Sequence, residues 1–137
     1  SAVEILQSTL QRIGQVEGRN GALAQTTTEE DKSKVHAFIT LTDDLAMQQA
    51  QTVDAALAEG KDPGPLAGVP FTVKDIFCVT DTPSTAASKI LANFKAPYTA
   101  TAVERMQKAG AVMLGKVGMC GVKGVLLVFA DFMRRQS

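Results

Sequence analysis

Apolar residues recur at a helical spacing in two segments of the chain. Near the N-terminus they step by three, four and three positions along one stripe, which consists of Val3, Leu6, Leu10 and Ile13. A second stripe contains Ala46, Ala50, Val53 and Leu57. Both patterns are typical of amphipathic helices. Asp43 or Asp44 is expected to cap the second helix at its positive end, and Gly60 stands where its C-terminal cap belongs.

Three other segments have the composition of strands. Residues 36–42 (HAFITLT) are rich in β-branched and aromatic side chains, residues 69–73 alternate apolar and polar positions, and residues 111–114 (AVML) are wholly apolar. Pro70 favours an edge position, or an irregular stretch at the start of the second of these strands, because proline cannot donate a ladder hydrogen bond. A bend at Lys74 and Asp75, followed by a further short strand over residues 76–80, is also expected.

Two shorter helices are predicted before the last strand. Residues 84–94 carry apolar positions at Ala87, Ile90, Leu91 and Phe94. The run from Thr101 to Glu104 has the form of a capping box and opens a helix that Gly110 ends. Because helices are followed directly by apolar strands, the fold class is expected to be α/β with some parallel pairing.

The composition argues against a few classes of function, namely binding to nucleic acids or charged membranes and spanning a membrane. The 137 residues carry 14 basic and 14 acidic side chains, so neither a nucleic acid nor a charged membrane surface has an electrostatic attraction to the chain as a whole. No apolar run approaches the roughly 20 residues of a membrane helix. Residues 18–34 are polar and are predicted to form an inserted surface loop. The apolar run within residues 121–137 could be a strand, a helical turn or sequence without a place in the fold.

Lys74 is the main candidate for chemistry, because a buried lysine loses its charge readily and can then act as a base. From periodicity alone, a surface lysine paired with Asp75 is the more common situation. His36 is the only histidine, and its distance from Cys78 and Cys120 matches no zinc-site spacing. Cys78 is expected to pack as a small apolar residue. The pair Gly115-Lys116 lacks the remaining positions of a phosphate-binding loop, so no ATP site is predicted in this chain.

Three longer motifs resemble the amidase signature family. They are GPLAGVPFTVKD (residues 64–75), TPSTAASKIL (residues 82–91) and TATAVERMQKAGAVMLGKVGM (residues 99–119). Within the family they look most like the A subunits of glutamyl-tRNA(Gln) amidotransferases. The resemblance covers residues 1–120 except the polar insertion. It implies the N-terminal part of an amidase-signature fold, a mixed sheet covered by helices, that is incomplete here.

The resemblance implies a catalytic triad of two serines and a lysine, and the family lysine falls on Lys74. The unprotonated lysine polarises a bridging serine, which activates a nucleophilic serine for attack on a carboxamide; an acyl-enzyme forms and ammonia leaves. In the tRNA-dependent complexes, a subunit of this kind works as a glutaminase. Its ammonia converts Glu-tRNA(Gln) to Gln-tRNA(Gln) on another amidotransferase subunit, which uses ATP and Mg²⁺. The implied partners are therefore those subunits, with tRNA reached only through the complex.

The chain departs from the family pattern at three points. It has no Gly/Ser-rich signature of the kind that holds both family serines, it has Ile76 where the family usually has asparagine, and residues 121–137 match nothing in the family. The sequence is therefore interpreted as truncated before the catalytic serines, by splicing, by an error in the gene model or by fragmentation. A non-catalytic interaction module and a piece of a free amidase are the alternatives. The expected location is the cytoplasm, or a chloroplast or mitochondrion in a eukaryote.

Overall fold

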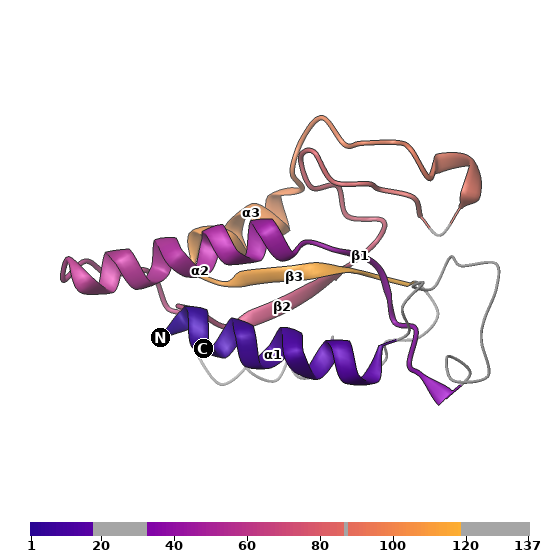
Figure 1. The fold of residues 1–137 in the computed structure, drawn as a ribbon. Helices are drawn as coiled ribbons and strands as arrows, with labels where there is room; N and C mark the ends of the chain where they lie inside the picture. The colour runs from indigo at the N-terminus through magenta and orange to yellow at the C-terminus, as the bar shows by residue number, and fades with distance from the viewer. Residues whose placement is uncertain (18–32, 87, 119–137) are drawn as a thin grey trace.

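A computed structural model describes residues 1–17, 33–86 and 88–118. Most of the predicted polar insertion, Ala87, Cys120 and the divergent tail lie outside the described residues. The elements are α1 (Ala2–Val16), β1 (Phe38–Leu41), α2 (Asp43–Ala58), β2 (Pro70–Lys74), the 3₁₀ helix η2 (Lys89–Leu91), α3 (Thr101–Lys108) and β3 (Val112–Val117). Figure 1 shows α1 and α2 lying along the sheet, with the segment between β2 and α3 extending away from it.

The described strands form one mixed sheet in the order β1-β3-β2. The central strand β3 runs parallel to β2 and antiparallel to β1, and all six of its residues are buried. The α/β class with parallel pairing is therefore confirmed. Pro70 opens β2 on the edge of this sheet, as its missing N–H predicts.

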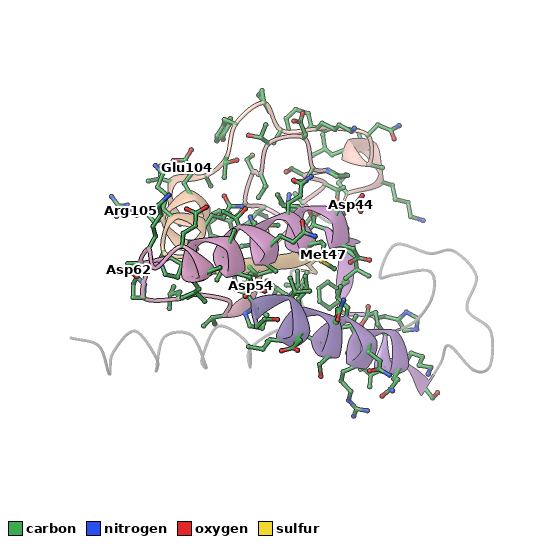
Figure 2. The ribbon with its side chains drawn as sticks, turned by 60° about the vertical axis from the view of Figure 1, so that its left-hand side comes forward. Asp44, Met47, Asp54, Asp62, Glu104 and Arg105 are labelled. Atoms are coloured by element: carbon green, nitrogen blue, oxygen red, sulfur yellow. The ribbon has the colours of Figure 1, made fainter. Side chains whose placement is uncertain are left out.

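Helix α1 follows the predicted apolar stripe and is held at its N-terminus by α2. Ser1 and Glu4 form a capping box. The carboxylate of Asp54, on α2, accepts hydrogen bonds from the backbone N–H groups of Ala2 (2.7 Å) and Val3 (3.1 Å) (Figure 2). These contacts satisfy donors that the first turn of a helix cannot pair internally, and they lower the pKa of Asp54.

Helix α2 buries Ala46, Ala50 and Val53 of the second stripe, whereas Leu57 near its end is exposed, and its predicted cap is corrected. Its N-cap residue is Thr42, without a capping side-chain bond, while Asp43 and Asp44 lie in the first turn. The Thr42 hydroxyl instead donates to the carbonyl of Met113 on β3, at 3.0 Å. At the other end, Gly60 adopts a left-handed φ of 70° and ends the helix as predicted.

Two apolar clusters enclose β3. The first joins α1 and α2 to one set of β3 residues, and the second joins β2, α3 and the preceding loops to the alternate set. The buried members of the first cluster are Ala2, Leu6, Ala46, Ala50, Val53, Val112 and Leu114. Those of the second are Leu66, Phe71, Val79, Val103, Ala111 and Met113. This alternation is what a central strand covered on both faces requires.

Three local predictions were wrong. Residues 76–80 form a turn and an extended segment that makes only an isolated bridge from Thr80 to Ala96. In the described residues of 84–94 the one helical element is η2, and Ile90 on the expected buried stripe is 94% exposed. The N-cap of α3 is Ala100, so Thr101 caps nothing. In residues 84–94, the apolar positions Ile90, Leu91 and Phe94 are exposed, so their spacing does not correspond to a face that another element covers.

Candidate active site

Lys74 ends β2 beside the end of the parallel strand β3. It is in register with Val117, and both strands finish at the same edge of the sheet. In open α/β sheets the carboxyl ends of parallel strands are the usual place for ligands. The side chain is half-buried, and among the described residues it has no hydrogen-bond or ion-pair partner. The ammonium group is therefore not committed to a neighbour in this part of the chain, contrary to the predicted surface pair with Asp75.

The backbone turns immediately after Lys74. The N–H of Asp75 donates to the carbonyl of Val117 at 3.0 Å, and the N–H of Phe77 donates to the carbonyl of Lys74 at 2.9 Å. The first bond continues the contact with β3 and the second closes a turn. The bend predicted at this point is thus confirmed, and Lys74 lies where a regular strand changes into a turn.

Asp75 has no exposed surface. Its Oδ2 accepts hydrogen bonds from the backbone N–H of Thr85 (3.0 Å) and from the hydroxyl of the same residue. Its Oδ1 lies 3.4 Å from Nζ of Lys116 and has no hydrogen bond within the described structure. A buried carboxylate needs such donors because burial removes its hydration.

Lys116 is the other buried charge at this end of the sheet. It lies inside β3, in register with Val73, and its Nζ donates to the carbonyl of Pro83 (2.7 Å) and to the hydroxyl of Ser84 (2.6 Å). Burial lowers the pKa of Lys116, and the charge of the Asp75 carboxylate acts in the opposite direction. The four side chains of Asp75, Ser84, Thr85 and Lys116 are hereafter called the buried polar cluster.

The buried polar cluster is not predicted by the sequence patterns. The pattern at Lys116 indicates only an incomplete phosphate-binding loop, and the one at Asp75 indicates only a bend or a surface partner for Lys74. One signal was available: Lys116 interrupts a run that is otherwise apolar or glycine from Ala111 to Gly118. A lysine in a central strand requires buried partners, but the sequence does not say that residues 83–85 supply them.

Of the remaining candidates, Cys120 lies outside the described residues, and neither His36 nor Cys78 has a side-chain hydrogen bond with Lys74 among those that are described. His36 is half-buried and precedes β1 with a positive φ of 51°, so the strand begins only at Phe38. Cys78 is half-buried, and a hydrogen bond with its side chain raises the pKa of Tyr98. No group of three potential metal ligands occurs among the described residues, and no helix in the described ranges could cross a membrane.

A family model described as Amidase matches residues 22–123, which is more than half of the chain. The chain belongs to the amidase family. The similarity extends to curated proteins named as the A subunit of glutamyl-tRNA(Gln) amidotransferase. The protein from Thermobifida fusca is 44% identical over 119 residues, and the one from Desulfotalea psychrophila is 45% identical over the same length. In both cases the match covers 87% of this chain and 21% of the relative.

Solved amidase structures share the fold. The peptide amidase from Stenotrophomonas maltophilia superposes with a TM-score of 0.70 at 31% identity, covering 88% of this chain and 22% of that protein. A structure from a vestigial complex related to an s-triazine catabolic enzyme gives a TM-score of 0.71 at 31% identity, covering 87% of this chain and 23% of the other. The described α/β arrangement is therefore part of the amidase fold, and the chain spans about a fifth of each of these proteins.

Proposed function

We propose that Lys74 is the lysine of an amide-cleaving site whose two serines are supplied by amidase sequence outside these 137 residues. The observation that carries the proposal is its position: a half-buried lysine without a partner among the described residues, at the carboxyl end of β2 and within the family motif VKD. A lysine in this setting can hold or release a proton at Nζ without first breaking an ion pair.

In the proposed reaction, Nζ of Lys74 takes part in proton transfer through a bridging serine to the nucleophilic serine. The nucleophile attacks the carboxamide carbon, backbone N–H groups hold the oxyanion, and ammonia leaves as the acyl-enzyme forms. Water then hydrolyses the ester. Because such residues act as a unit, the lysine alone gives no turnover. We accordingly expect the 137-residue chain by itself to release no ammonia from glutamine above background.

The proposed substrate is glutamine, and the proposed parent protein is the amidotransferase A subunit. The identities of 44% and 45% to proteins of that name favour this choice over a free amidase. A protein of this kind delivers ammonia to a partner amidotransferase subunit, where we place ATP and Mg²⁺; the tRNA is reached only through that complex. The 31% identity to a peptide amidase supports hydrolysis of a free amide as the second candidate.

A chimera tests the proposal directly. Residues 1–118 of this chain would replace the matching segment of the Thermobifida fusca relative, and ammonia release from glutamine would be measured. We expect Lys74→Ala to lower kcat/KM about 10³-fold or more, since loss of one member disables a catalytic unit. Lys61→Ala, at an exposed ion pair with Glu59, is the matched control and should retain activity.

An active chimera with Lys74→Ala at parental rate would overturn the role of Lys74. Turnover by the isolated 137-residue chain that Lys74→Ala abolishes would instead show that the site needs no outside serines. Dependence of the product on ATP, tRNA and a partner protein separates the amidotransferase from the free amidase.

A further inference from the structure

The buried polar cluster adjoins the proposed catalytic lysine but does not touch its amine. Side chains alternate along β2, so Lys74 points to the opposite side of the sheet from Val73. Val73 is in register with Lys116. The contact that links the cluster to Lys74 is the backbone of the turn at Asp75.

The cluster connects three segments that are distant in sequence. Asp75 ends the contact between β2 and β3, Lys116 lies within β3, and residues 83–85 come from the segment beyond the turn. The backbone N–H of Asp75 is bound to β3 and its carboxylate is bound to Thr85, so the residue after Lys74 is held at both ends. A rotation of this peptide would break buried hydrogen bonds, each of which is costly to leave unmade.

Stability alone is a weak reason for such a cluster. Replacing a buried ion pair by apolar residues of similar volume is often neutral or stabilising, whereas the charged arrangement defines one geometry. The geometry defined here is that of the turn following Lys74. We propose that Asp75, Thr85 and Lys116 are positioning residues that fix the backbone at Lys74 and thereby the direction of its side chain. This inference rests on the proposed function of Lys74.

Thr85 offers the sharpest test in the full 137-residue chain. Thr85→Val removes the hydroxyl that donates to Asp75 and keeps the side-chain shape, while Thr85→Ser keeps the hydroxyl. The readout is the acetylation rate of Lys74 by an N-hydroxysuccinimide ester, measured by mass spectrometry under native conditions. The exposed lysines Lys61 and Lys108 serve as internal standards.

We expect Thr85→Val to raise the Lys74 rate about threefold relative to the standards, because the turn opens locally more often. Thr85→Ser should restore the parental rate. A role in global stability alone would lower the melting temperature without changing this ratio in the folded protein. Equal ratios in the parent and both folded variants would overturn the proposal.

If Thr85→Val does not fold, Ser84→Ala tests the proposal with the same measurement of Lys74 acetylation. This variant removes one of the two hydrogen-bond acceptors of Lys116 and leaves Pro83 and Asp75 in place. We expect a rise of about twofold in the Lys74 ratio, since one contact of several is lost. An unchanged ratio would contradict the proposal. Labelling needs no turnover, so its failure is distinct from a failure of the proposed activity.

Discussion

Different interactions hold two regions of the molecule in place. One region is the helix pair α1–α2, and the other is the segment that links β2 to α3. Along the helices, Leu6, Ala46 and Ala50 are buried at positions set by a helical period. The linking segment, residues 76–86 and 88–99, exposes several large apolar side chains and is called here the arm. The apolar pattern therefore describes the first region correctly and the second incorrectly.

Polar contacts replace the apolar stripe in the arm. The hydroxyls of Thr80 and Thr99 lie 2.9 Å apart across its two sides, and Thr85 and Ser84 bind charges at the sheet. These partners are far apart in sequence. An apolar spacing therefore predicts a helix only where another element covers the resulting face.

The largest expected loss of stability follows from a substitution in the buried polar cluster, where the arm contacts the sheet. Lys116→Met should destabilise the fold by about 3–5 kcal/mol, because it leaves the Asp75 carboxylate buried without its opposite charge. Urea unfolding at neutral pH measures the free energy of unfolding. The double variant Lys116→Met, Asp75→Asn is the control and should recover part of the loss; a single variant as stable as the parent would show that the charge is not needed.

Shortening one buried side chain between α1 and α2 should lower the free energy of unfolding somewhat less. Leu6→Ala deletes a side chain that is 1% exposed and should cost about 2–4 kcal/mol through lost burial and a residual cavity. Its neighbour Ile5 is 50% exposed, so Ile5→Ala provides the matched control with a much smaller loss. Equal losses in urea unfolding would contradict the assigned face of α1.

A smaller effect that depends on pH is expected where α2 caps α1. Hydrogen bonds from the N–H groups of Ala2 and Val3 lower the pKa of Asp54 in the folded state. Its stabilisation is therefore present above the pKa of the unfolded chain and is lost as the pH falls through the lower, folded pKa. Melting temperatures of the parent and Asp54→Asn should differ most near neutral pH and converge in acid. A constant difference across the titration would rule out the charge as the cause.

The smallest effect is expected on the apolar surface of the arm. Ile90→Ser should change the free energy of unfolding by no more than about 0.5 kcal/mol, because the side chain is 94% exposed. Buried Val103, in the second apolar cluster, gives the contrast, since Val103→Ala removes two buried methyl groups and should cost more than about 1 kcal/mol. Urea unfolding measures both variants. A large loss for Ile90→Ser would mean that residues 84–94 do form the buried helix that their spacing suggested.

Elements whose contacts are local or periodic can be predicted from the order of the residues. Each of these features depends on residues that are close in sequence. They are the apolar stripes of α1 and α2, the apolar run of β3, the proline at the start of β2, and Gly60 at the end of α2. The family motifs also indicate Lys74 as the candidate catalytic lysine. Its half-buried position at the carboxyl end of β2 agrees with the predicted strand and bend.

Which polar groups become buried, and with which partners, depends on how the folded chain brings distant segments together. Thr42 binds β3 instead of capping α2, and Lys116 meets Asp75 and Ser84 across gaps of tens of residues. The physical reason is that hydrophobic periodicity is a property of one segment, whereas the free energy of a buried charge depends on donors and acceptors that folding brings from elsewhere.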